Sequence, residues 1–557
     1  MSQSSQFTTH EVFNQSPSFE DVNLFTSDRA LREVAIREGG GGAEQMLTAY
    51  GSFAGSALGQ HMARLANEDL PRLRTFDSKG RRLDVVEYHP AYHDIMRESV
   101  RAGLHCLSWD LPPDGGEPYP GRNVARAGLL HMAAQLEPGH CCPLTMTNAG
   151  VATLLLAPSI AESWVPLLLS RHYDPAFLPA HEKAGLTLGM GMTEKQGGTD
   201  VRANTTRADP IGPGGPEEGY LIVGHKWFLS APMSDAFLVL AQAPGGLSCF
   251  FMPRVLPDGS INPIRIQRLK DKLGNRSNAS AEVEFAGCRA WLVGEEGRGI
   301  ATIMDMVTFT RLDCAVSSAG LMRSALANAL HHTAHRAAFQ RRLIDQPLMR
   351  QVLADLALDS EAATALAFRL ARAFDEAGAV PAEAAFRRVM TPVIKYWVCK
   401  TCPGFVYEAM ECLGGNGYVE EGPAARLYRE APVNAIWEGS GNVMCLDVAR
   451  VAERDPDAMA SVMEQLGEHC RGDKTLEAAF EDLRGRMAGL AGDQSALRSL
   501  VERLALLWAA GLLRASDSVE VADAFIASRI AGGFRNGYGA GPKLDDAAIL
   551  ERAAPVE

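Results

Sequence analysis

The sequence predicts a mainly helical protein with a small β domain inserted between helical regions, and two observations support this fold class. Long segments with apolar residues at helical spacing occupy both ends of the chain. Between about residues 184 and 293 the pattern changes to short β-branched and aromatic runs, such as 219–231 and 236–243, separated by Gly, Pro, Asp and Asn. We therefore expect four regions, with boundaries at 1–183, 184–293, 294–450 and 451–557.

The first region is expected to be helical. Segments of helix length at Ala43 to Leu65, Asp94 to Cys106 and Val124 to Gln135 alternate with turn clusters. The four glycines at 39–42 are interpreted as a flexible loop. The Pro- and Gly-rich stretch 111–120 is interpreted as a second turn cluster.

The two regions after the β domain return to helical patterning. Ala and Leu recur at helical spacing between Gly299 and Arg450, and the last segment is again helical before a Gly-rich loop and a polar tail. The longest uncharged apolar run, 504–513, is about half a membrane span. Because the N-terminus also has no basic start followed by an apolar core, we expect a cytoplasmic protein without a membrane segment.

Charge and cysteine usage exclude some classes of protein. The chain has 54 basic and 67 acidic residues, and its formal charge of −13 disfavours a protein that mainly holds nucleic acid. Eleven cysteines in a long chain are expected to be reduced thiols. Cys399 and Cys402 have a CxxC spacing, but no second pair follows, and both lie in an apolar stretch. We favour buried small hydrophobes there and expect no metal site.

Common cofactor and catalytic motifs are absent from the sequence. There is no Walker-type G-x-x-x-x-G-K-[ST] loop, no G-x-S-x-G elbow and no H-E-x-x-H zinc helix. Gly-rich stretches such as 294–299 do not follow a strand and open a helix, as the dinucleotide-binding fold requires. These absences exclude a Rossmann-type nicotinamide enzyme. They do not by themselves indicate another class of enzyme.

Separated motifs carry a family resemblance. MTEKQGGTD (192–200), GHKWFLS (224–230) and LGGNGY (413–418) are followed by IWEGSGN (436–442). Their order and spacing resemble the acyl-CoA dehydrogenase superfamily of flavoproteins over nearly the whole chain. The resemblance implies an N-terminal helical domain, a middle β-barrel, a C-terminal four-helix bundle and an extra C-terminal helical region. It also implies a homotetramer with FAD between the β and helical domains.

The resemblance also implies which residues contact FAD. They are Met192, Thr193, Gly198, Thr199, Phe228, Leu229, Ser230, Arg336, Phe339, Gly414, Gly415, Ser440 and Asn442. Phe228 would lie against the flavin, Ser230 at its edge and Thr199 at the pyrophosphate, whereas Arg336 and Phe339 would reach the FAD of a neighbouring subunit. The alternatives are an ordinary Gly-rich turn at 197–198, a core aromatic at Phe228 and a surface arginine at Arg336.

Glu438 in IWEGSGN is the candidate catalytic base. Desaturation of an acyl thioester removes a proton α to the carbonyl while the β hydride passes to flavin, so a carboxylate must face the substrate. Some family members carry the base just before an arginine that corresponds to Arg311, but here that residue is Thr310, which cannot be a base. Arg311 is expected either to position Glu438 or to cap the bundle. An acyl-CoA is the implied substrate, and an electron-accepting flavoprotein is an implied partner.

A second hypothesis concerns DNA. Some superfamily members that this chain resembles are implicated in resistance to DNA alkylation and are thought to bind duplex DNA through the extra C-terminal region. The alternative function is therefore a DNA-binding flavoprotein with weak or vestigial dehydrogenase activity.

The charge of the extra region bears on this alternative. Residues 451–557 carry 12 basic and 18 acidic side chains, which disfavours strong non-specific DNA binding. The candidates for a basic patch are Arg426, Arg429, Arg450, Arg529 and Arg535. We expect them to be solvated or ion-paired instead.

Overall fold

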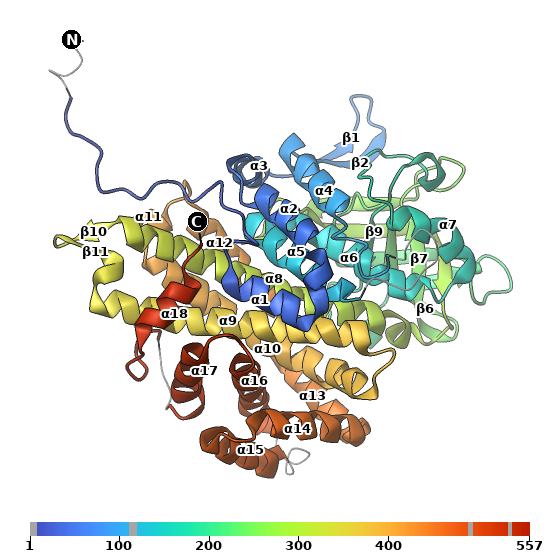
Figure 1. The fold of residues 1–557 in the computed structure, drawn as a ribbon. Coiled ribbons are helices and arrows are strands. Elements are labelled where there is room, and N and C mark those ends of the chain that lie inside the picture. Colours follow the sequence, from blue (N-terminus) through green and yellow to red (C-terminus); the bar gives the residue numbers. More distant parts are fainter. Residues whose placement is uncertain (1–7, 111–119, 488–493, 533–536, 557) are drawn as a thin grey trace.

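The order of domains is the one that the sequence predicts. The structure is a computed structural model that describes residues 8–110, 120–487, 494–532 and 537–556. Figure 1 shows a body of helices with the β domain on one side, and the C-terminal helices packed below the bundle. The expectation of a mainly helical fold with an inserted β-barrel is confirmed.

The N-terminal region contains seven helices in its described part. They are α1 (Arg29–Ala35), α2 (Glu44–Ala54), α3 (Ala57–Glu68), α4 (Pro90–Ala102), α5 (Arg122–Leu136), α6 (Pro138–Leu154) and α7 (Pro158–Leu168). The segment 43–65 is two helices and not one, because the chain before α1 crosses it. A Cβ at Gly55 would lie 1.7 Å from the carbonyl oxygen of Val22, so only glycine allows this crossing.

The interpretation of the four glycines as a flexible loop is wrong. They continue α1 through a π-helical turn, η2 (Ile36–Gly40), and a 3₁₀ turn, η3 (Gly41–Ala43). Gly39 has φ 109°, and a Cβ at Gly40 would lie 2.9 Å from the Ala35 carbonyl oxygen. The positive φ favours glycine at position 39, and close packing requires it at position 40. The turn cluster 111–120 lies outside the described residues except for Pro120.

A two-stranded hairpin in the N-terminal region was not expected. β1 (Arg72–Phe76) and β2 (Arg82–Glu87) pair in antiparallel fashion around residues 77–81. The alternation of polar and apolar residues over 72–74 and 82–85 is the sequence signal for it.

The middle domain is a closed β-barrel. Its strands are β3 (Leu188–Gly191), β4 (Arg207–Pro210), β5 (Gly219–Ser230), β6 (Ala236–Ala243), β7 (Gly246–Pro253), β8 (Ile264–Leu269) and β9 (Ser280–Val293). The sheet closes because β6 pairs with both β4 and β7, which are joined through β5 and β9. Buried side chains such as Phe237, Phe250 and Phe285 fill the barrel.

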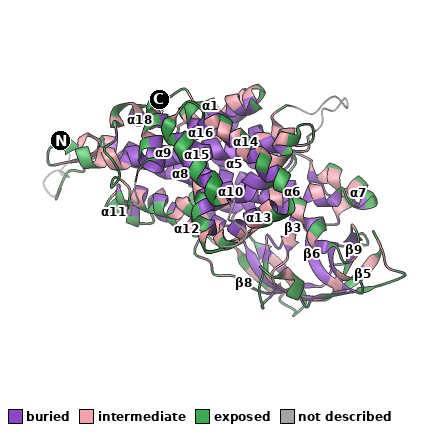
Figure 2. Ribbon diagram, turned by 90° about the horizontal axis from the view of Figure 1, so that it is seen from below, coloured by how far each residue is buried: buried purple, intermediate pink, exposed green. Residues whose placement is uncertain are grey.

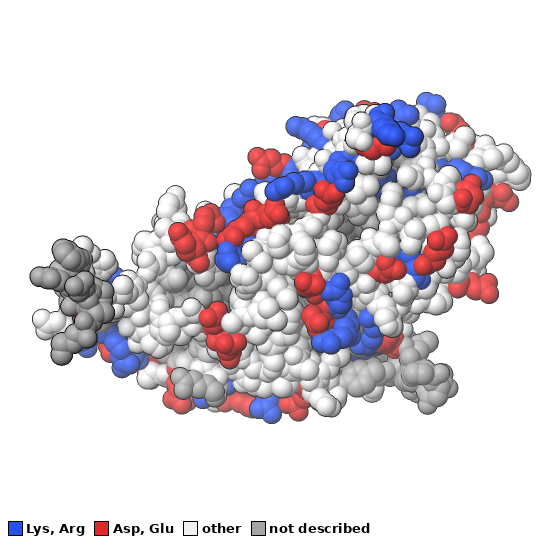
Figure 3. Space-filling view, turned by 90° about the horizontal axis from the view of Figure 1, so that it is seen from above, with Lys and Arg blue, Asp and Glu red and all other residues white. Residues whose placement is uncertain are grey.

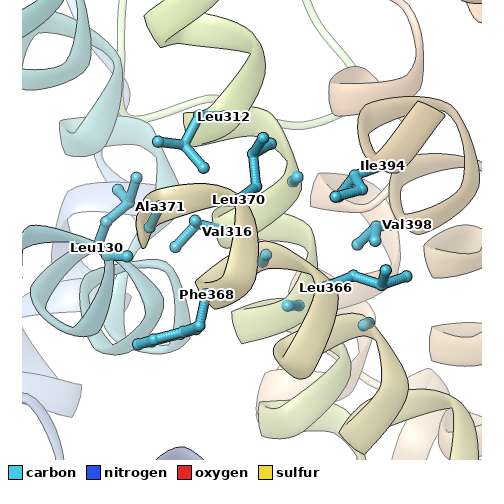
Figure 4. Packing of buried hydrophobic residues seen from close by; sticks show 14 of the residues in the cluster. Leu130, Leu312, Val316, Leu366, Phe368, Leu370, Ala371, Ile394 and Val398 are labelled. Atoms are coloured by element: carbon cyan, nitrogen blue, oxygen red, sulfur yellow. The ribbon is translucent and has the colours of Figure 1, made fainter. Parts of the chain in front are cut away.

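Long helices build the bundle beside the barrel. They are α8 (Gly299–His335), α9 (Pro347–Glu376), α10 (Pro381–Glu411) and α13 (Gly441–Arg454). The short elements between them are β10 (Ala337–Ala338), β11 (Arg341–Arg342), α11 (Gly415–Tyr418) and α12 (Pro423–Glu430). Figure 2 shows that buried residues follow the inner faces of α8, α9 and α10. Figure 4 shows the packing of side chains from this interior, among them Leu130, Val316, Phe368 and Val398.

The extra C-terminal region packs on α9 and α10. Its helices are α14 (Pro456–Cys470), α15 (Lys474–Met487), α16 (Leu497–Arg514), α17 (Val519–Phe525), η9 (Ile526–Ile530) and α18 (Asp546–Ala553). The fully buried Trp508 of α16 meets Phe386 of α10 with ring centroids 4.9 Å apart. The apolar run 504–513 is therefore core. Among the described residues, we find no helix with the length and apolar character needed to span a membrane.

The arginines considered for a basic patch are mostly neutralised. Arg529 is buried between Asp355 and Asp359, Arg429 pairs with Glu420, and Arg450 lies 3.8 Å from Asp447. Arg426 is part-buried and donates to the carbonyl oxygen of Leu136. Figure 3 shows basic and acidic side chains interspersed over the face seen from above. The expectation of ion pairing is confirmed for Arg429, Arg450 and Arg529, and Arg535 lies outside the described residues.

The cysteines are buried free thiols. All eleven lie in described parts of the chain. Cys399 and Cys402 lie on α10 and are buried, and the Cys399 sulfur is 3.4 Å from the Ser318 hydroxyl of α8. Within the described residues, no cluster of three or more His, Cys, Asp or Glu could hold a metal ion.

Candidate active site

A cavity of about 980 Å³ lies where the barrel meets the bundle. Its walls come from α6, the loop after β3, the end of β5, the loop after β8, the first half of α8 and residues 430–454. Apolar side chains such as Met190, Ile303, Val307 and Val443 line it together with a few polar groups. This composition is typical of a site for a large, partly apolar ligand.

The loop after β3 forms one wall of the cavity. Met192, Thr193, Gly198 and Thr199 all line it, as the sequence predicts. A Cβ at Gly198 would lie 2.4 Å from the Thr193 hydroxyl oxygen, and Gly197 has φ 147°. Glycine at both positions therefore lets the loop fold back against Thr193.

A buried ion pair fixes this loop from beneath. The Glu194 carboxylate accepts hydrogen bonds from Lys226 Nζ at 2.8 Å and from the backbone N–H groups of Thr205 at 2.7 Å and Thr206 at 3.1 Å. Burial alone would raise the pKa of Glu194, but the hydrogen bonds from Lys226 and Thr206 outweigh it and lower the pKa well below 4.5. Glu194 therefore stays ionised and holds the loop in place.

The end of β5 places two of its three predicted residues on the cavity. Phe228 and Ser230 line it, and Phe228 is 46% exposed, so it is not a core aromatic. Leu229 is fully buried in the barrel core, because successive side chains of a strand point to opposite faces. The predicted contact by Leu229 is therefore not made by its side chain. Ser230 Oγ lies 3.1 Å from Ser280 Oγ.

Glu438 also lines the cavity and is held by α8. Its carboxylate accepts a hydrogen bond from Thr310 Oγ1 at 2.7 Å, and its backbone carbonyl accepts one from Arg311 Nε at 3.1 Å. Arg311 is anchored in turn by Asp447, with Nη1 and Oδ2 2.7 Å apart. Of the two roles expected for Arg311, the structure therefore supports positioning of Glu438.

The backbone around Glu438 is unusual and is stabilised by a lysine. Glu438 has φ 57° and Gly439 has φ 101°, so two consecutive residues adopt the left-handed region. Lys395 Nζ donates to the carbonyl oxygens of Trp437 at 2.9 Å and Gly439 at 2.5 Å. These bonds fix a strained turn that aims the carboxylate into the cavity.

The environment of Glu438 alters its acidity. Burial raises the pKa of Glu438 above 4.5, and the hydrogen bond from Thr310 and the charge of Arg311 offset part of that increase. A carboxylate with a raised pKa is a stronger base than an exposed one.

The other predicted contact residues do not all lie at the cavity. Ser440 lines it, whereas the Asn442 side chain accepts a hydrogen bond from Arg498 Nε of α16 at 2.8 Å. Arg336, Phe339, Gly414 and Gly415 are not among the lining residues. They belong to the end of the bundle that carries β10, β11 and α11 (Figure 1).

The β10–β11 hairpin presents its turn to solvent. Phe339 is 96% exposed, and both Phe339 and Gln340 adopt positive φ, 52° and 66°. Gln340 therefore adopts a backbone conformation that favours glycine. Arg336 Nη1 donates to the carbonyl oxygen of Asn14 at 2.6 Å. Within one chain this element does not reach the cavity.

Sequence reasoning missed a polar group at the base of the cavity. Lys272 Nζ donates to the Asn278 carbonyl oxygen at 2.6 Å and to Ser280 Oγ at 2.9 Å. Glu430, which is 2% exposed, accepts hydrogen bonds from the Asn275 N–H at 2.7 and 2.8 Å. Lys272 lies in the loop between β8 and β9, and no spacing rule in the sequence connects this lysine to β5.

Glu430 makes stability depend on pH. Burial, followed by the charge of Glu137, raises the pKa of Glu430 from 4.5 to about 7. The folded state therefore holds this proton more tightly than the unfolded chain, and stability falls as the pH rises through this window. We expect Glu430→Gln to stabilise the protein by about 1–3 kcal/mol at pH 8 and to have little effect at pH 5. Thermal unfolding at both pH values tests this, and an equal effect at both would contradict it.

Comparison with known proteins agrees with this geometry. The chain matches family models for the adaptive response protein AidB N-terminal domain (residues 14–175), the acyl-CoA dehydrogenase middle domain (189–288) and the acyl-CoA dehydrogenase C-terminal domain (297–453). It is 48% identical over 480 residues to the putative acyl-CoA dehydrogenase AidB of Escherichia coli strain K12, covering 86% of this chain and 87% of that protein.

Solved structures show the same fold. Caenorhabditis elegans ACDH-11, crystallised in complex with C11-CoA, superposes with a TM-score of 0.85 at 27% identity and covers 96% of both chains. An acyl-CoA dehydrogenase from Bacillus anthracis, crystallised with FAD, superposes with a TM-score of 0.63 at 19% identity, covering 78% of this chain and 76% of that one. The match to ACDH-11 therefore includes the extra C-terminal helices.

Proposed function

Because the chain belongs to the acyl-CoA dehydrogenase family, we propose that it is an FAD-dependent enzyme that removes an α proton and a β hydride from an acyl-CoA. One observation carries the proposal. The carboxylate of Glu438 and the wall formed by residues 192–199 and the end of β5 line the same cavity. A base and a flavin must flank the substrate in this reaction.

The residues on the flavin wall fit the cofactor. Hydroxyl groups of Thr193 and Ser230 would bond to polar atoms of the ring, and Gly198 lets the loop pack against Thr193. Thr199 and Arg202 line the cavity farther along and suit a pyrophosphate. Bound FAD would supply the acceptor for the hydride.

The protein's own residues would handle the proton. The Glu438 carboxylate takes the α proton as the C–H bond breaks, and its raised pKa suits a weakly acidic C–H group. Thr310 and Arg311 hold the side chain and the backbone of Glu438 in one orientation. The apolar wall formed by Ile303, Val307 and Val443 would bind the acyl chain and keep water out.

The substrate's CoA portion would bind near α13. Arg454 lines the cavity from this helix and places a cation suited to a phosphate group. The complex of ACDH-11 with C11-CoA supports acyl-CoA as the substrate class. An electron-accepting flavoprotein is the proposed physiological oxidant.

Product analysis tests the proposed reaction. The FAD-loaded protein is incubated with a panel of straight and branched acyl-CoAs and an artificial electron acceptor, and the products are examined by mass spectrometry. We expect at least one acyl-CoA to lose two hydrogen atoms. The absence of any such product from a fully FAD-loaded sample would contradict the proposal.

Thr310→Val is expected to shift the pH dependence of the reaction. The hydrogen bond from Thr310 stabilises the ionised form of Glu438, so its loss raises the pKa of that carboxyl further. The acidic limb of the kcat/KM profile should move up by about one pH unit, with the rate about tenfold lower on that limb and little changed at high pH. An unshifted limb would show that Thr310 does not act on Glu438.

The DNA-protecting role is the second candidate, and the match of residues 14–175 to the AidB N-terminal domain favours it. The pairing of Arg429, Arg450 and Arg529 argues for weak binding at most. The strength of DNA binding is measured by the retention of duplex DNA by the protein across a salt series. Binding that persists at physiological salt would support the role, and no binding at low salt would exclude it.

We also propose a homotetramer. Large apolar side chains are exposed at the end of the bundle beside β10, β11 and α11, namely Phe339 (96%), Leu348 (84%) and Tyr418 (81%). Patches of this kind mark contact surfaces. Light scattering of the purified protein measures the mass, and a monomer at all concentrations would contradict the assembly.

A further inference from the structure

A lysine lies directly behind the predicted flavin edge. Ser230 Oγ is 3.1 Å from Ser280 Oγ, and Lys272 Nζ donates to the same Ser280 oxygen at 2.9 Å. Lys272 and both serines line the main cavity. A continuous chain of hydrogen bonds therefore joins an ammonium group to the serine that would bond to the flavin.

Lys272 is part-buried and differs from the buried lysines Lys183 and Lys226. Lys226 pairs with Glu194 at 2.8 Å, and Lys183 pairs with Asp235 at 2.5 Å. No carboxylate of the described residues forms an ion pair with Lys272, whose side-chain partners are a carbonyl and a hydroxyl. Burial lowers the pKa of Lys272 to about 8, which leaves most of this group charged at neutral pH. The charges of Glu430 and Glu137 act on Lys272 without forming an ion pair with it, so the ammonium group can still stabilise a negative charge on a bound ligand.

The cofactor of the proposed reaction supplies such a charge. A hydride carries one negative charge, so its acceptance leaves the bound cofactor more negative by one unit. A fixed cation in a poorly solvated cavity stabilises that charge without further reorganisation. Hydrogen bonds that run from the cation to the ring strengthen the effect, because each polarises the next.

We propose that Lys272 is a positioning residue that tunes the flavin: through Ser280 and Ser230 it stabilises the reduced cofactor and raises its reduction potential. The inference rests on the proposed FAD function. It gives the 268–280 stretch a role beyond shaping the loop after β8, because charge placed near the reactive part of a flavin sets its electronic properties.

Three substitutions separate the charge of Lys272 from its hydrogen bonds. Lys272→Gln keeps a donor and removes the charge, Lys272→Met removes both, and Lys272→Arg keeps both. Lys79→Met, in the exposed turn of the β1–β2 hairpin, removes a lysine far from the cavity and serves as the control. A purely structural role would make the Gln and Arg variants behave alike.

The test is the reduction equilibrium of each FAD-loaded protein against a reference dye, read from the absorption spectrum. We expect Lys272→Gln and Lys272→Met to lower the ratio of reduced to oxidised flavin about tenfold, which is about 30 mV for a two-electron couple. For Lys272→Arg and Lys79→Met, the ratio of reduced to oxidised flavin should stay within about threefold of the wild-type ratio. This difference is well under about 30 mV.

Two negative outcomes are distinguishable. An unchanged potential in FAD-loaded Lys272→Gln would overturn the tuning role and leave the proposed function intact. A wild-type protein that binds no FAD would overturn the proposed function, and the tuning role with it.

Discussion

Replacing Glu438 by glutamine is expected to slow reduction of the flavin by an acyl-CoA about 10²–10⁴-fold. An amide of the same shape can still accept the hydrogen bond from Thr310 Oγ1, but it cannot take up the α proton. Stopped-flow absorption under anaerobic conditions measures the rate. The FAD content should stay at the wild-type level, because other residues make the proposed FAD contacts.

The matched control is Glu453→Gln, which makes the same exchange at an exposed position near the end of α13. Its rate should equal that of wild type. Reduction of the Glu438→Gln protein at the wild-type rate would show that another group takes the proton, and the assignment of the base would be wrong.

Replacing Arg529 by methionine should destabilise the protein by about 3–5 kcal/mol. Its guanidinium lies between Asp355 and Asp359, with Nη1 2.5 Å from Asp355 Oδ1 and Nη2 2.9 Å from Asp359 Oδ1. All three side chains are almost completely buried, so the change removes a cation from two buried carboxylates. These two ion pairs also join η9 of the extra C-terminal region to α9.

Urea unfolding followed by circular dichroism measures this loss. Arg471→Met removes an exposed arginine that pairs only with Glu468 within the same helical turn, and it should change stability by less than about 0.5 kcal/mol. An equally small effect of Arg529→Met would show that the ion pairs do not hold the C-terminal region in place.

The sequence predicts those parts of the site that depend on local motifs. Met192, Thr193, Gly198 and Thr199 lie together in one loop, so their motif places them on one wall. The inserted barrel was also predictable, because strand patterning is local. The burial of the Leu229 side chain was predictable, since the alternation of side chains in β5 sends it into the barrel core once Phe228 faces the cavity.

Other features depend on tertiary contacts that no local pattern encodes. The run of glycines at 39–42 is typical of a loop in sequence. In the structure, a Cβ added at Gly40 would lie 3.0 Å from a side-chain carbon of Val124, so the backbone packs closely there. Lys272 is connected to Ser230 only because the pairing of β5 with β9 brings Ser280 beside Ser230. Arg336 and Phe339 lie on an exposed hairpin, so their predicted role requires a second subunit.

The central claim is that the cavity holds FAD and presents an acyl-CoA to it. Anaerobic titration of the purified, FAD-loaded wild-type protein with a panel of short and branched acyl-CoAs tests this claim most directly. We expect at least one acyl-CoA to bleach the visible absorption band of the flavin in a saturable manner. A band that stays unchanged with every acyl-CoA, in a protein with full FAD content, would show that the cavity does not present an acyl-CoA to the flavin.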